Sequence, residues 1–84
     1  MGVDHEGAEP LYFQLAAILR EQITSGELPP GRPIPSEATL QQRYGVSRGT
    51  ASHAVRLLRE EGIVKMTFGR GTYVVPEDER PTPD

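Results

Sequence analysis

Apolar residues recur at intervals of three and four residues in two stretches of the chain, which is the spacing of one buried face on an α-helix. The first stretch predicts a helix that begins at Pro10 and ends at Gly26, with Tyr12 and Phe13 packed in the core. The second predicts a helix that Ser47 caps and that Gly62 ends. The two stripes consist of Leu11, Leu15, Ile18, Leu19 and Ile23 in the first helix and Ala51, Ala54, Val55 and Leu58 in the second.

A shorter helix is predicted between these two. Four prolines between positions 29 and 35 favour a stiff, extended path that ends at Ser36. Ser36 is a suitable N-cap for a helix over residues 37–44, and Gly45 allows the chain to turn before Ser47. A short capped helix, a turn of about three residues and a second capped helix form the helix-turn-helix pattern, in which the second helix protrudes.

After Gly62 the pattern changes to that of β-strands. Residues 63–67 and 72–75 are rich in strand-forming side chains, and the glycine-containing turn Phe68–Gly71 separates them. These features predict a β-hairpin that follows the last helix. The expected fold class is mainly α with a small β-hairpin (α+β), arranged as a three-helix winged helix-turn-helix.

The charge distribution divides the chain into three parts. A length of 84 residues allows one small domain, and the net charge is −3. Residues 10–75 carry eight basic and five acidic side chains, whereas residues 1–9 and residues 76–84 each carry a net −3. We therefore expect a disordered acidic N-terminal tail over residues 1–9, a locally basic folded domain over residues 10–75, and an acidic, proline-containing linker or tail over residues 76–84.

The helix that begins after Ser47 has a small, polar and basic side opposite its apolar stripe. This side consists of Arg48, Gly49, Ser52, His53, Arg56 and Arg59. Such a side fits the major groove of DNA, because small side chains allow close approach and arginines bind phosphates or guanine edges. The alternative is an ordinary solvated helix face. Likewise, Arg70 between two glycines at the hairpin tip can enter a minor groove, or it can belong to a simple soluble turn.

Several ordered motifs between residues 10 and 75 make the chain similar to the N-terminal DNA-binding domain of GntR-family bacterial transcription regulators. The motifs are Pro10-Leu11-Tyr12, Gln14-Leu15, Ile23, Ser25-Gly26-Glu27-Leu28-Pro29-Pro30-Gly31, Ile34-Pro35-Ser36-Glu37, Tyr44-Gly45-Val46-Ser47-Arg48, Leu58, Glu61-Gly62-Ile63-Val64 and Gly69-Arg70-Gly71-Thr72-Tyr73-Val74. The resemblance implies a winged helix-turn-helix that binds operator DNA as a homodimer, through Ser36, Ser47, Arg48 and Thr50 at the helix starts and through Gly69 and Arg70 in the wing.

The expected function is sequence-specific binding of double-stranded DNA by a bacterial transcriptional regulator, a repressor of a palindromic operator. The expected DNA-binding residues are Ser36, Ser47, Arg48, Gly49, Thr50, Ser52, His53, Arg56, Gly69 and Arg70. The chain departs from many relatives at Ala38, where they carry a basic residue, and at Gly49, Ser52 and His53. A shifted base preference with Arg48 as the main base reader is expected. Relatives usually continue into a C-terminal domain that binds a small effector and dimerises.

The alternative function is a winged-helix module for protein–protein contact, which the net acidity and the residues at positions 38 and 52 favour. Against it, the polar helix face shows none of the aromatic or leucine side chains expected of a protein-docking face. No nucleophile–base pair, metal-ligand cluster or phosphate-binding loop indicates an enzyme, a cofactor or a metal site. The chain has no cysteine, no apolar run long enough to span a membrane and no secretion signal, so a cytoplasmic location is expected.

Overall fold

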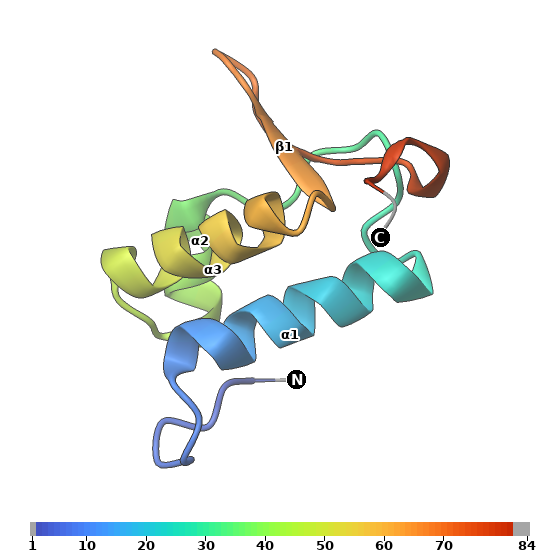
Figure 1. The fold of residues 1–84 in the computed structure, drawn as a ribbon. Helices are drawn as coiled ribbons and strands as arrows, with labels where there is room; N and C mark the ends of the chain where they lie inside the picture. Colours follow the sequence, from blue (N-terminus) through green and yellow to red (C-terminus); the bar gives the residue numbers. More distant parts are fainter. Residues whose placement is uncertain (1, 82–84) are drawn as a thin grey trace.

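Three helices are followed by one antiparallel hairpin that projects from them (Figure 1). The structure, a computed structural model, describes residues 2–81. Its elements are α1 (Leu11–Ser25), α2 (Glu37–Tyr44), α3 (Arg48–Glu60), β1 (Val64–Thr67), β2 (Gly71–Val74) and the short 3₁₀-helix η1 (Glu77–Glu79). The predicted fold, a three-helix winged helix-turn-helix with a small hairpin, is confirmed.

The predicted apolar stripes form the core between the helices and the base of the hairpin. The fully buried side chains include Leu15 and Leu19 from α1, Leu40 from α2 and Leu58 from α3. Val46 in the turn between α2 and α3 is also buried, and Val64 and Val74 close the core from the hairpin. Helix α3 packs against both α1 and α2, so its four buried positions, Ala51, Ala54, Val55 and Leu58, fix which side of α3 faces outward.

Serine caps and glycines define the helix-turn-helix as predicted. The Oγ atoms of Ser36 and Ser47 each accept a hydrogen bond, 3.1 Å long, from the backbone N–H three residues later. Gly45 follows α2 with φ of +65°, and its N–H donates to the carbonyl of Gln41. The chain therefore needs only residues 45–47 to pass from α2 to α3.

Two glycine substitutions test this turn and are expected to have opposite signs. Gly45→Ala places a Cβ in the left-handed region, which costs about 1–2 kcal/mol, although it meets no atom closer than 3.8 Å. Gly49→Ala lies in α3 with open space around it, and replacing a helical glycine adds up to about 1 kcal/mol of stability. Urea unfolding of both variants measures the difference. Equal stabilities for the two would contradict the assigned backbone geometry at Gly45.

The end of α3 is fixed by backbone hydrogen bonds and by one ion pair. Gly62 has φ of +79°, and the N–H of Ile63 donates to the carbonyl of Leu58, so the chain turns where Gly62 was predicted to stop the helix. Next to this turn, Nε and Nη2 of Arg20 donate to the two carboxylate oxygens of Glu61, at 3.0 and 2.6 Å. The turn and the ion pair hold the end of α3 beside α1.

The proline-rich connection has a role that the sequence analysis did not predict. It is extended, as expected, but it also lies along β2 like a third strand. The N–H of Gly31 donates to the carbonyl of Val74, that of Val74 to Arg32, and that of Ile34 to Thr72, each at 2.9 Å. Pro33 forms a bridge with Tyr73. The connection between α1 and α2 therefore supports the base of the hairpin.

Some local expectations differ from the structure. Phe13 was expected in the core but is 43% exposed, because the neighbouring Tyr12 takes the position that faces α3. The second strand begins at Gly71 and ends at Val74, one residue earlier than expected, because Thr67 pairs with Gly71. These shifts leave the hairpin and the core intact.

The two acidic ends, expected to be a disordered tail and a linker, make contacts in the structure. The Gln14 side chain bonds the N–H and carbonyl of Asp4 and the carbonyl of Glu9, at 2.6–2.9 Å. Nε2 of His5 lies 3.0 Å from the carbonyl oxygen of Gly45. At the other end, Nε of Arg80 donates to the carbonyl of Val75. Met1 and residues 82–84, assigned to these ends by the sequence analysis, lie outside the described residues.

Candidate nucleic-acid interface

Helix α3 presents its basic side to solvent. Arg48, Gly49, Ser52 and Arg56 are exposed, and they lie opposite the buried stripe of the helix. Within residues 2–81 the ion pair found joins Arg20 to Glu61, so neither Arg48 nor Arg56 is neutralised by a carboxylate within 4.0 Å. The predicted orientation is confirmed for these four residues, whereas His53 and Arg59, which were assigned to the same face, are half-buried. The face is narrow at Gly49 and Ser52 and positively charged on both sides of them.

The same hydroxyl arrangement occurs at the starts of α2 and α3. Ser47 Oγ accepts from the N–H of Thr50 and donates to its Oγ1, at 3.1 and 2.9 Å. Ser36 makes the same two bonds to Thr39. Because each serine hydroxyl is used as a cap, the hydroxyl hydrogens of Thr39 and Thr50 are available to donate outward. Thr39 was missed by the sequence analysis, although the repeated Ser-x-x-Thr spacing was a readable signal.

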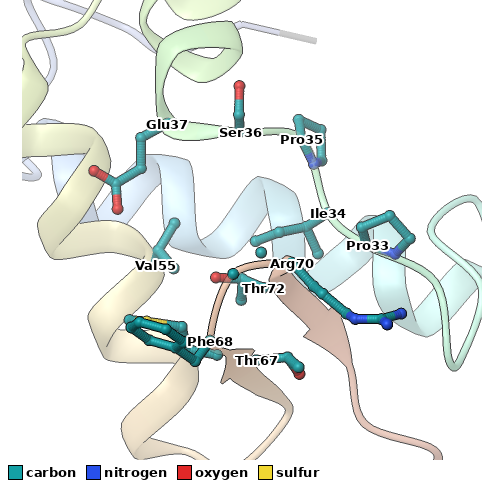
Figure 2. A pocket seen from close by; sticks show the side chains of 13 residues that line it. Pro33, Ile34, Pro35, Ser36, Glu37, Val55, Thr67, Phe68, Arg70 and Thr72 are labelled. Atoms are coloured by element: carbon teal, nitrogen blue, oxygen red, sulfur yellow. The ribbon is translucent and has the colours of Figure 1, made fainter.

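The hairpin tip is stabilised by a glycine-containing turn and exposes a cation. In this turn the N–H of Arg70 donates to the carbonyl of Thr67 at 3.0 Å, and Gly69 has φ of +75°, a conformation that favours glycine. The Arg70 side chain is exposed, and Figure 2 shows it directed away from α3. The hairpin therefore forms the predicted wing, with a basic side chain at its tip.

A groove lies between the wing, the start of α2 and the middle of α3. It brings together residues distant in sequence, including Ser36 and Glu37 from α2, Val55 from α3 and Phe68 from the wing (Figure 2). Ser36 and Arg70, two of the predicted site residues, both line this groove, Ser36 from the start of α2 and Arg70 from the wing.

His53 differs from the other predicted site residues. Its ring stacks on Tyr12 of α1, with the ring centroids 3.6 Å apart and the planes 11° from parallel. The side chain is half-buried, and one face of its ring is covered. His53 therefore lies at the edge of the α3 face next to α1, where it contributes to holding the two helices together.

The wing carries exposed apolar side chains, although no exposed aromatic or leucine side chains typical of a protein-docking face were expected. Phe68 at the wing tip is 99% exposed and Met66 is 59% exposed. They were not assigned to the site. Alternation along β1 places Met66 on the same face as Val64, and Phe68 is the apolar residue that follows β1 in the turn.

Two classes of site were also searched for among residues 2–81. No group of three or more His, Cys, Asp or Glu side chains in this part of the chain could hold a metal ion. None of its helices is long and apolar enough to cross a membrane.

Comparisons with known proteins identify relatives of this fold and site. The chain is 49% identical over 71 residues to the mannosyl-D-glycerate transport/metabolism system repressor MngR of Escherichia coli (strain K12), covering 84% of this chain and 30% of that protein. It is 38% identical over 74 residues to the HTH-type transcriptional repressor NagR of Bacillus subtilis (strain 168), covering 88% of this chain and 30% of that protein. The chain thus spans about a third of the length of these curated relatives.

Among solved structures, the crystal structure of AraR(DBD) in complex with operator ORX1 superposes with a TM-score of 0.82. It is 29% identical, and the match covers 89% of this chain and 95% of that one. The sequence model described as "Bacterial regulatory proteins, gntR family" matches residues 11–74, which run from the start of α1 to the end of β2. The chain therefore belongs to the gntR family of bacterial regulatory proteins.

Proposed function

We propose that this domain binds double-stranded DNA as the DNA-binding domain of a bacterial transcriptional regulator. The observation that carries the proposal is the outward basic face of α3, whose Arg48 and Arg56 form no ion pair with any of residues 2–81, together with two hydroxyl-capped helix starts and a basic hairpin tip. The operator complex of AraR(DBD) supports this function through the shared fold. The repressor names of MngR and NagR support repression as the regulatory outcome.

In this proposal α3 enters the major groove with its N-terminal end toward the bases. Arg48 lies on the first turn of α3, exposed and, within the described part of the chain, without a carboxylate partner. A guanidinium there can bind guanine O6 and N7 in a bidentate manner. Gly49 and Ser52 are small enough to let the helix axis approach the base edges, and Arg56 lies one turn beyond Ser52, where it can bind a phosphate. His53 remains at the α1 edge of this interface.

Phosphates are held at the helix starts. The N–H groups of the first turns of α2 and α3 point toward the same side as the Ser36 and Ser47 caps, and the helix dipoles favour an anion there. Thr50 has the hydroxyl hydrogen free to donate, because Ser47 is already bonded to it. These contacts fix the register of α3 on the duplex without reading its sequence.

The wing completes the interface from the neighbouring minor groove. Gly69 keeps the tip slim, and Arg70 supplies a positive charge where the groove potential is most negative. Lys65, exposed on β1, adds phosphate attraction.

The remaining features of the regulator are proposed from the resemblance. Residues 10–75 form the DNA-binding domain, and residues 1–9 and 76–84 are its acidic flanks. Two copies bind a palindromic operator as a homodimer, with half-sites related by the protein's two-fold axis. If the full-length protein has a C-terminal domain, a small-molecule effector binds there. The regulator works in the cytoplasm, without enzymatic activity or a cofactor.

The salt dependence of duplex binding tests this proposal. Each neutralised phosphate contributes a slope of about −0.9 to the plot of log affinity against log salt. If three or four of the exposed cations bind phosphates, affinity falls roughly 40- to 150-fold between 50 and 200 mM salt. Fluorescence anisotropy with a labelled duplex, chosen by selection from random DNA, measures it. An affinity that barely changes over this range would overturn the contact scheme.

A further inference from the structure

The apolar face of the wing continues beyond the core. Val64 and Met66 share one face of β1, and Phe68 follows in the turn at the tip, on the side nearer to α3 in Figure 2; their exposed fractions rise from 1% to 59% to 99% toward the tip. Val64 closes the core, but Met66 and Phe68 reach past it. A phenylalanine side chain that is almost wholly in water forgoes the stabilisation of burial, so this ring contributes nothing to the fold of the isolated domain.

The wing tip has two chemically different sides. Phe68 lies on the side nearer to α3, whereas the guanidinium of Arg70 lies on the opposite side (Figure 2). Lys65 and Tyr73 line the same outer surface as Arg70. A charged group can therefore approach the outer side, and an apolar group can approach the side that faces α3.

The groove beneath Phe68 has a polar end at the start of α2 and an apolar part nearer the wing. The polar end holds Ser36 and the carboxylate of Glu37, whereas Val55, Ile34 and two prolines supply apolar walls. Arg70 borders the groove but extends away from it. The sugar-phosphate strand that separates a major groove from the adjacent minor groove must pass between α3 and the wing. Its deoxyribose rings match these walls better than its phosphates do.

We propose that Phe68 is an apolar DNA contact, whose ring packs against the deoxyribose edges of the minor groove. Arg70 binds phosphate from the other side of the same tip. This inference rests on the proposed function, and it adds a contact that neutralises no charge. Other proteins that enter minor grooves also use apolar side chains there, which they insert between base steps. Phe68 then contributes to affinity without contributing to its salt dependence.

Phe68→Ala and Arg70→Ala form a matched pair of tests at neighbouring wing positions. We expect Phe68→Ala to weaken duplex binding roughly 5- to 20-fold at both 50 and 200 mM salt, from the lost burial of the ring. Its salt slope stays that of the parent. Arg70→Ala lowers the slope by about 1, the value for one phosphate contact. Because both side chains are exposed, both variants keep the parent's melting temperature, which is the control for folding.

A fluorescence signal provides an independent readout. The chain contains no tryptophan, so Phe68→Trp places a single reporter at the tip. Its emission is expected to shift to the blue when the duplex is added, because the indole leaves water. Two results would overturn the inference. One is unchanged emission of Phe68→Trp while anisotropy shows that the duplex is bound. The other is a Phe68→Ala variant that binds the duplex as tightly as the parent, which would favour a protein partner for this face. If the parent itself does not bind duplex, the proposed function fails, which is a separate result.

Discussion

Arg48→Ala is expected to lose roughly 10- to 100-fold in affinity for the selected duplex, because a bidentate arginine–guanine contact contributes about 1–3 kcal/mol. Arg48 is exposed on the first turn of α3, and it forms no ion pair with a carboxylate of the described residues. Affinity for random duplexes falls much less, since one of several cations is removed. Competition between the selected duplex and shuffled sequence measures both quantities in one titration.

Two control variants separate base reading from charge. Arg48→Lys keeps the positive charge but loses the planar fork, so it retains random-duplex binding and loses the base preference. Arg43→Ala removes an exposed arginine from the last turn of α2, which the proposed interface does not include. It is expected to behave almost like the parent. If Arg48→Ala still prefers the selected duplex over shuffled sequence as strongly as the parent does, another side chain reads the sequence.

Leu58→Ala is expected to cost about 2–5 kcal/mol of folding free energy. Leu58 has no exposed surface and lies in α3 within the core that α1, α2 and the hairpin share. A domain of this size has a total stability of only about 5–10 kcal/mol, so the variant is expected to be partly unfolded at 37 °C. Urea unfolding followed by circular dichroism measures the loss.

Leu57→Ala is the matched control, because it removes the same atoms from the neighbouring residue of α3. Leu57 is half-buried and lies at the margin of the core. Its loss is expected to be clearly smaller than that of Leu58. Equal losses for the two variants would contradict the assigned orientation of α3, and with it the outward direction of the basic face.

The features that could be predicted from the sequence are those set by local chemistry. Ser36 and Ser47 were recognised as caps because their hydroxyls satisfy N–H groups three residues away. The outward direction of Arg48 followed from the buried stripe of its own helix. Gly62 was recognised as the helix stop because a left-handed residue was needed there. Each of these depends on interactions within about one helical turn.

The features that escaped prediction depend on contacts between distant segments. Tyr12 and Phe13 are adjacent in a helix and point about 100° apart, so only the crossing of α1 and α3 decides which one packs inward. His53 looked like a free polar side chain until that crossing placed Tyr12 against it. Phe68 was predicted to lie in the turn, and it does, but its exposure was not predicted, because that depends on how far the hairpin extends past the core.

The strand-like pairing of the proline-rich connection has a consequence for how copies of this protein meet in solution. A short hairpin normally offers unpaired amides along its outer edges, and these recruit strands from other molecules. Here the free side of β2 is covered by a segment with prolines at positions 29, 30, 33 and 35. Prolines lack the N–H that edge-to-edge association needs. The covering segment therefore protects the sheet from aggregation while leaving the tip of the wing free.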